Sequence, residues 1–166
     1  MKNLWAPWRV KYIQSITHPD DECVFCKAPQ RDKDKEMLIL YRGRRNFIIM
    51  NKFPYNNGHM MVVPYVHMSS LDEQSDEGML EMWQLARDCK KALSRTLHCD
   101  GANLGMNLGR VAGAGIDQHI HLHIVPRWNG DTNFMPVIHD TKVISQGMDE
   151  TYDLLCSALQ EIAGTS

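Results

Sequence analysis

The stretch "DQHIHLHIVPRW", residues 117–128, carries a histidine at every second position of its centre. The histidines are His119, His121 and His123, and the apolar residues that alternate with them are Ile120, Leu122 and Ile124. Successive side chains of a β-strand point to opposite faces, so this strict alternation predicts a strand. We expect its apolar residues to face a core and its imidazoles to line the opposite face of the sheet.

The spacing of these histidines also bears on metal binding. At a rise of about 3.3 Å per residue, His119 and His123 lie roughly 13 Å apart along a strand. One zinc ion, with Zn–N bonds of about 2.0–2.1 Å, cannot reach all three imidazoles of a regular strand. The row therefore indicates a catalytic surface rather than one metal cage.

Length and charge limit the classes of function. The 166 residues suffice for one well-buried core and are too few for two ordinary domains. The chain has 18 Lys and Arg residues and 20 Asp and Glu residues, so its net charge is near zero. It therefore lacks the global positive potential that favours non-specific binding of nucleic acid. We expect no nucleic-acid partner, and any phosphate ligand has to be held by local groups.

The cysteines and the apolar runs predict a cytoplasmic protein. No apolar run approaches the 18 or so residues of a membrane span, and "MKNLWAPWRV" lacks the apolar segment of a secretory signal. Of the five cysteines, Cys89, Cys99 and Cys156 show no paired spacing, which argues against a disulfide framework. Only Cys23 and Cys26, in "CVFC", need another explanation.

The hydrophobic pattern predicts an α+β fold, a mostly antiparallel five-stranded sheet with one long amphipathic helix. The expected strands are residues 37–41, 46–51, 59–64, 101–107 and 117–128. "RGRR" is typical of a turn, and the Asn-Gly pair of "PYNNG" favours a hairpin. The helix is expected over residues 71–97, with Ser69, Ser70 or Asp72 as its N-cap. Residues 108–115, "LGRVAGAG", are expected to form a glycine-rich loop.

His-φ-His-φ-His-φ-φ, where φ is apolar, is matched by residues 119–125, and Pro126 and Arg127 follow it. Together with "NLGRVAGAG", "NNGHMMVVP" and the helix between them, this stretch closely resembles the histidine triad (HIT) family of nucleotide hydrolases and transferases. "LWAPWR" and "WNGDTNFMPV" look like a bacterial subgroup that includes diadenosine tetraphosphate phosphorylases. The resemblance predicts a core domain over residues 37–128. Residues 1–36 are expected to be an N-terminal arm outside the core, with a short helix, and residues 129–166 a C-terminal extension of the same domain.

The resemblance implies cleavage at an α-phosphate through a nucleotidyl-histidine intermediate. His121 takes the nucleophile's role, and His123, His59 and His119 complete the predicted catalytic set. A pKa near 6.5 keeps much of a histidine's imidazole as the free base at neutral pH. His123 and His59 are expected to donate to the phosphate oxygens or to relay a proton. On local sequence alone, His59 is equally compatible with a structural histidine.

The resemblance also implies nucleotide-binding residues. Asn51 matches the family position that hydrogen-bonds the ribose, and Asn107 matches a polar position beside the phosphates. Gly113 and Gly115 allow the backbone N–H groups of their loop to approach an anion. This loop departs from the family pattern, which has Gly-Gln followed by Ser or Thr before the triad. On sequence alone, both asparagines are also compatible with turns at strand ends.

A structural zinc site is predicted at Cys23 and Cys26, a C-x2-C pair that needs two more ligands. Some triad proteins and the related galactose-1-phosphate uridylyltransferases bind zinc through such a set of ligands. The resemblance therefore implies His67 and His119 as the two further ligands. Such a site would fasten the arm beside His121, and catalysis would need no metal. The alternatives are a reduced pair without metal and, less favoured, a redox motif.

The predicted function is a nucleotide hydrolase that acts on dinucleoside polyphosphates or related nucleotidyl substrates. The alternatives are a diadenosine tetraphosphate phosphorylase, which transfers the nucleotidyl group to phosphate, and a catalytically idle nucleotide-binding module. The apolar stripe of the long helix and an unpaired sheet edge favour a homodimer. The stripe comprises Met79, Met82, Trp83, Ala86 and Leu93.

Overall fold

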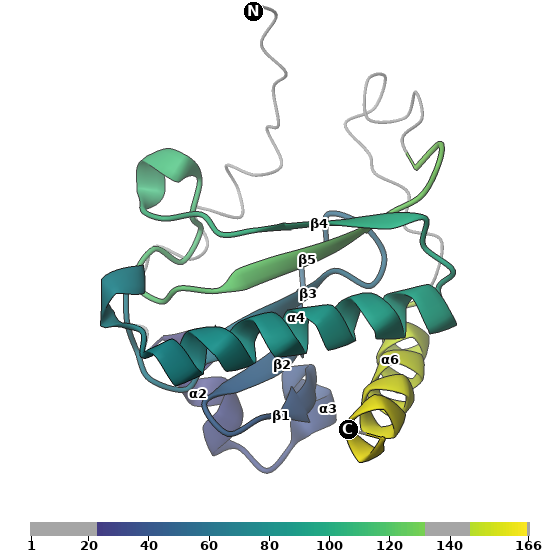
Figure 1. Ribbon diagram of the computed structural model, residues 1–166, viewed down its shortest axis with the longest axis horizontal. Coiled ribbons are helices and arrows are strands. Elements are labelled where there is room, and N and C mark those ends of the chain that lie inside the picture. Colours follow the sequence, from purple (N-terminus) through teal and green to yellow (C-terminus); the bar gives the residue numbers. More distant parts are fainter. Residues whose placement is uncertain (1–22, 132–146, 166) are drawn as a thin grey trace, which may run out of the picture.

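A five-stranded antiparallel sheet forms the centre of the molecule, as the computed structural model of residues 23–131 and 147–165 shows (Figure 1). Its strands are β1 (Ile39–Arg42), β2 (Asn46–Met50), β3 (Met60–Pro64), β4 (Gly101–Gly105) and β5 (Leu122–Arg127). They lie in the order β1-β2-β3-β5-β4, and every neighbouring pair is antiparallel. The predicted fold class is confirmed.

The central strands bury both of their faces. In β2, Ile48 and Met50 enter the core beneath the long helices, whereas Phe47 and Ile49 enter a second core on the other face. Strand β3 divides its side chains in the same alternating way. This is the period of two that a strand imposes, with apolar partners on both sides. Two layers of chain therefore cover the sheet.

The first layer contains the long helix α4 (Asp76–Thr96), which crosses the sheet in Figure 1. It begins five residues later than expected, because Ser75 is its N-cap and accepts from the backbone N–H of Gly78. Ser70 instead caps the short 3-10 helix η2 (Leu71–Glu73) in a capping box with Glu73. The sequence holds two start signals in succession, and only the second begins the α-helix.

The second helix of this layer, α6 (Met148–Gly164), was not expected, so the prediction of only one long helix was wrong. It packs beside α4 and fills the remainder of the first core. Its buried side chains recur every three or four residues, as in an amphipathic helix. They are Thr151, Tyr152, Leu155, Ala158, Leu159 and Ile162.

The N-terminal arm forms the layer on the opposite face. Its short helices are α2 (Val24–Lys27), the 3-10 helix η1 (Ala28–Gln30) and α3 (Asp34–Met37). The expectation that residues 1–36 stay outside the core was wrong for Phe25 and Ala28, which are 3% and 0% exposed in the second core. The charged run that follows them hid this contribution. Residues 1–22 lie outside the described residues.

Two loops differ from the expected connections. Strands β2 and β3 form the expected hairpin, but their connection is the long loop of residues 51–59 rather than a tight turn. Gly58, with φ of 73°, lies in the last turn of this loop. The histidine strand begins at Leu122 rather than at residue 117. Residues before it leave the sheet because the N–H of Ile120 donates to the carbonyl of Met68. The glycine-rich loop is confirmed, with the 3-10 helix η3 (Arg110–Ala112) inside it. None of the described helices has the length and apolar composition needed to cross a bilayer.

Glu81 of α4 fixes the turn between β1 and β2. Its carboxylate accepts from the backbone N–H groups of Arg44, Arg45 and Asn46 at 2.7–2.9 Å, and from the side-chain amide of Asn46 at 2.8 Å. Burial alone would raise the pKa of Glu81, but these hydrogen bonds together lower it. The ionised side chain therefore stabilises the fold.

We expect Glu81→Gln to lower the free energy of unfolding at pH 7 by about 2 kcal/mol, because an amide cannot accept from all of these donors. A carboxylate with a lowered folded-state pKa contributes stability above its unfolded pKa and loses it as the pH falls through the folded one. The deficit of the variant should therefore shrink between pH 5 and pH 3. Urea unfolding at both pH values measures this, and a deficit independent of pH would contradict it.

Candidate active site and metal cluster

Four histidines gather on the face of the sheet that the arm covers. His59 ends the loop before β3, His123 lies within β5, and His119 and His121 precede β5 directly. His123 is paired in register with Met61 of the neighbouring strand. Leu122 and Ile124 point into the first core, so the predicted alternation is confirmed within β5. Ile120, His119 and His121 lie before the strand, so the prediction of one continuous face of three imidazoles was too simple.

The hydrogen bonds of His59 and His123 indicate which ring nitrogen carries the proton in each residue. The backbone N–H of Tyr55 and the side-chain amide of Asn51 lie 3.1 and 3.3 Å from Nδ1 of His59, which therefore accepts. His59 then carries its proton on Nε2 and donates it to Nδ1 of His123 over 3.0 Å. Neutral His123 in turn has its own proton on Nε2. Two successive hydrogen bonds thus connect the backbone amide of Tyr55 to the ring of His123.

His121 has the opposite tautomer. Its Nδ1 lies 2.8 Å from the carbonyl oxygen of His119, so Nδ1 carries the proton and Nε2 keeps its lone pair. The side chain is 6% exposed, and burial lowers its pKa even though the carbonyl favours the protonated form. Its ring lies against that of His123, with 4.7 Å between centroids. A neutral imidazole with an available nitrogen therefore adjoins a ring that can donate.

His119 directs its ring away from this pair. Its Nε2 donates to the carbonyl of Pro64 over 2.9 Å, which leaves Nδ1 to face the arm. Burial lowers the pKa of His119 to about 4, so the ring is neutral at physiological pH. Of the catalytic and metal roles predicted for His119, the geometry of its ring favours the metal role.

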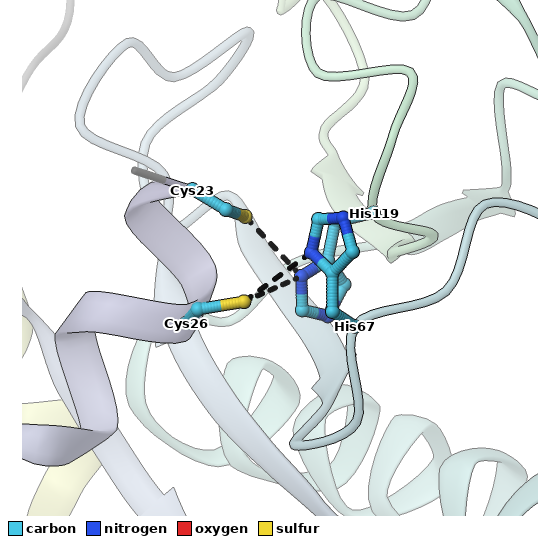
Figure 2. Close-up of side chains that lie close together, drawn as sticks. All are labelled: Cys23, Cys26, His67 and His119. Carbon is cyan, nitrogen blue, oxygen red and sulfur yellow. Dashed lines mark hydrogen bonds between the residues drawn. The ribbon is translucent and has the colours of Figure 1, made fainter. Parts of the chain in front are cut away.

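Cys23 and Cys26 lie close to His67 and His119, as Figure 2 shows. Cys26 is in α2 and Cys23 is its N-cap, and both imidazoles lie opposite the two thiols. Cys23 Sγ lies 3.3 Å from Nδ1 of His119, and Cys26 Sγ lies 3.3 Å from Nδ1 of His67. All four ligand atoms fall within 4.8 Å of one another. Tetrahedral zinc bonds of about 2.3 Å to sulfur and 2.0–2.1 Å to nitrogen would separate such ligands by about 3.6 Å. The sequence thus predicted a cluster that the fold brings together.

The chemistry of this cluster suits a soft divalent cation. Burial and the neighbouring Cys23 raise the pKa of Cys26 to about 11, so the Cys26 thiol stays protonated without a compensating charge. A bound metal ion would supply that charge and displace the thiol proton. The hydrogen bond from His119 to Pro64 fixes the tautomer that presents Nδ1, as outer partners of metal ligands commonly do.

The predicted nucleotide-binding residues lie in loops near these histidines in the chain. Asn51 contacts His59 with its amide nitrogen, and its oxygen accepts from the backbone N–H of Phe53 over 2.9 Å. Asn107 follows β4 and is partly exposed. In the glycine-rich loop, Gly113 adopts φ of 89°, a left-handed conformation that suits glycine, whereas Gly115 does not have a positive φ.

Two aromatic residues beside the site were not predicted. Phe25 lies between the cysteines, and its ring centroid is 5.0 Å from that of His121. Tyr55 stacks on His59 at 4.8 Å. The one sequence feature that could have indicated Phe25 is its place as an apolar residue inside the C-x2-C pair, which was itself expected beside His121.

Neighbouring imidazoles with opposite tautomers, next to a two-cysteine, two-histidine cluster on an antiparallel sheet, form the candidate active site of this protein. A family model described as the HIT domain matches residues 32–130. An AP-4-A phosphorylase from Mycobacterium tuberculosis strain H37Rv is 34% identical over 164 residues, covering 95% of this chain and 84% of the relative. The chain belongs to the HIT family.

Two further relatives agree with this assignment. An adenosine 5′-monophosphoramidase from Schizosaccharomyces pombe is 29% identical over 107 residues, covering 64% of this chain and 75% of the relative. The crystal structure of a Zn-bound histidine triad family protein from Mycobacterium smegmatis is similar with a TM-score of 0.70 and 27% identity. That likeness covers 87% of this chain and 98% of the other.

Proposed function

We propose that the protein cleaves dinucleoside polyphosphates or related nucleotidyl substrates at the α-phosphate, through a covalent nucleotidyl intermediate on His121. One observation carries the proposal: the carbonyl of His119 holds the proton of His121 on Nδ1, so that Nε2 keeps its lone pair. A nitrogen nucleophile needs this tautomer. The names of the phosphorylase and the phosphoramidase relatives support the substrate class.

The first step forms one bond and breaks one. The lone pair on Nε2 of His121 attacks the α-phosphorus, and the bond from phosphorus to the bridging oxygen breaks. The leaving phosphate takes that electron pair away. Nδ1 of His121 keeps its proton, and the His119 carbonyl stabilises the positive charge that develops on the ring. The Nε2–H of His123 donates to phosphate oxygens as their charge grows.

In the second step an acceptor oxygen attacks the phosphorus, and the P–N bond returns its electron pair to His121. Water as the acceptor gives a hydrolase, and inorganic phosphate gives a phosphorylase. The relative from Mycobacterium tuberculosis supports phosphate. Diadenosine tetraphosphate separates the two: phosphorolysis yields ADP and ATP and requires phosphate, whereas hydrolysis yields AMP and ATP without it.

We expect His121→Asn to abolish turnover and to leave nucleotide binding within a few fold, because asparagine has a similar reach but forms no phosphoramidate. His98→Asn is the matched control. His98 is exposed at the end of α4 with φ of 50°, a conformation that asparagine tolerates. Steady-state rates and calorimetric binding measure the two effects. Retention of a tenth of the wild-type rate in His121→Asn would remove the assignment of the nucleophile.

An idle nucleotide-binding module is the competing function. Such a module needs no nucleophile, and the two opposite tautomers of His121 and His123 favour the enzyme. Rapid quenching without acid, followed by mass spectrometry, distinguishes the two. The enzyme gains the mass of one nucleotidyl group on His121, and the module gains none.

We also propose that the cluster of Cys23, Cys26, His67 and His119 binds a structural zinc ion. The donor set and its separations support zinc, as does the Zn-bound relative from Mycobacterium smegmatis. Zinc would supply positive charge for two thiolates and would join the arm to the segment before β5. All five cysteines are free, which supports a protein that resides in a reducing compartment. We therefore propose that the protein is cytoplasmic.

We expect protein purified without added metal to contain one zinc per chain. The double change Cys23→Ser and Cys26→Ser should remove it and lower Tm by at least about 5 °C, because binding contributes to folding free energy. Cys156→Ser, which alters a thiol on α6, should retain the metal. Elemental analysis and calorimetry measure this. Zinc far below one per chain, with unchanged Tm in chelator, would contradict the site.

We further propose a homodimer through α4 and the outer edge of β4. Met82, Ala86 and Leu93 of the expected helix stripe are buried in the first core of this chain, so they do not contribute to such an interface. Trp83 is 51% exposed, and Leu104 of the edge strand is 40% exposed. Among residues 23–131 and 147–165 only β5 pairs with β4, and an outer edge with exposed apolar side chains favours pairing with a second copy.

We expect a sedimentation mass of twice 19.1 kDa at micromolar concentration. Leu104→Lys should shift it towards one chain, because a charge on the edge opposes strand pairing. Leu154→Lys is a matched control, since Leu154 on α6 is also 40% exposed. A mass of one chain for the wild-type protein would rule the dimer out.

A further inference from the structure

We propose that Phe25 is a positioning residue for His121, an inference that rests on the proposed function. Phe25 lies in α2 between Cys23 and Cys26 and is 3% exposed. Its ring centroid is 5.0 Å from that of His121, with the planes tilted by 50°. The arm thus contributes a buried aromatic side chain that contacts the nucleophile directly.

A second contact is needed because the hydrogen bond to the His119 carbonyl fixes only one atom of the His121 ring. The ring could still pivot about that bond, and Nε2 would then change direction. His123 contacts the ring at a centroid distance of 4.7 Å, and Phe25 is the other aromatic contact of His121 among the described residues. Two ring contacts and one hydrogen bond together fix the plane of the His121 ring and therefore the direction of its Nε2.

Phe25 also contacts the residue that accepts this hydrogen bond. Its ring is 5.5 Å from that of His119, with an interplanar angle of 80° in an edge arrangement. One side chain therefore packs against both partners of the bond that selects the tautomer of His121. A nucleophile misplaced by about 1 Å can lose roughly a hundredfold in rate. The effect of Phe25 should appear in kcat and hardly in KM.

The chain offers a matched pair of variants, Phe25→Leu and Phe47→Leu. Both residues belong to the second core, and Phe47 is 0% exposed. Phe47 has a ring contact with Tyr65 at 5.2 Å, and no ring contact joins it to a histidine among the described residues. Each substitution keeps an apolar side chain and removes a planar ring. The two variants therefore share the loss of packing and differ in the contact with His121.

The test measures the single-turnover rate of nucleotidyl-His121 formation from diadenosine tetraphosphate, together with KM, Tm and zinc content. We expect Phe25→Leu to slow adduct formation at least about tenfold with KM within about twofold, and Phe47→Leu to stay within twofold in rate. Imidazole ¹⁵N spectra should show one Nδ1–H tautomer of His121 in wild type and in Phe47→Leu, and mixed tautomers in Phe25→Leu.

Equal rates in the two variants would overturn the role of Phe25 and leave the proposed function intact. No adduct on wild-type protein would instead remove the proposed function, and the tautomers alone would then decide whether Phe25 holds the ring. If Phe25→Leu also loses zinc, His67→Ala becomes the reference, because it loses a ligand and keeps the aromatic ring. Phe25→Leu must then be slower than His67→Ala, and equal rates would overturn the proposal.

Discussion

The burial of both faces of the central strands is the constraint on which the rest of the structure depends. Strands β2 and β3 have no solvent-exposed side, so their alternate residues must fill two separate cores. Helices α4 and α6 cover one face, and the arm covers the other with Phe25 and Ala28. The arm is therefore required to complete the fold, and it brings its two cysteines to the histidine face.

Burial also decides how the imidazoles are protonated. His59, His119 and His121 are at most 6% exposed, and a polar nitrogen in such a place needs a protein partner. The backbone supplies most of these partners: the carbonyls of His119 and Pro64, and the N–H of Tyr55. Because backbone groups cannot change their role as donor or acceptor, they select one tautomer for each ring. The fold thus leaves a lone pair on Nε2 of His121 and a proton on Nε2 of His123, which are the two groups that the proposed chemistry requires.

Much of this arrangement could be predicted from local patterns. Alternation in residues 117–128 indicated the two faces of β5, and C-x2-C spacing indicated half of the metal cluster. The start of α4 was predicted wrongly, because Ser70 and Ser75 are both good N-caps and only tertiary packing chooses between them. Helix α6 was missed although its buried residues have helical spacing, since no motif drew attention to that segment.

Other features were beyond any local pattern. The histidine tautomers depend on groups that are distant in the sequence. The tautomer of His119, for example, is set by the carbonyl of Pro64, which lies 55 residues earlier in the chain. The burial of Phe25 was hidden because a charged run, residues 31–36, follows its segment, and because its partners lie on strands later in the chain. These contacts form only when the sheet has assembled, so the pattern of a single segment cannot predict them.

His119 joins the two parts of the site through different groups of one residue. Its ring faces the cysteines, whereas its carbonyl accepts from the nucleophile. A peptide carbonyl is present whatever the side chain is, so replacing the ring removes a ligand and leaves the acceptor in place. The cluster can therefore influence His121 by fixing the backbone position of residue 119, and not by exchanging a proton with it. In the proposed mechanism the ligands of the metal site therefore contribute rigidity to His121, and the proposed chemistry remains with His121, His123 and His59.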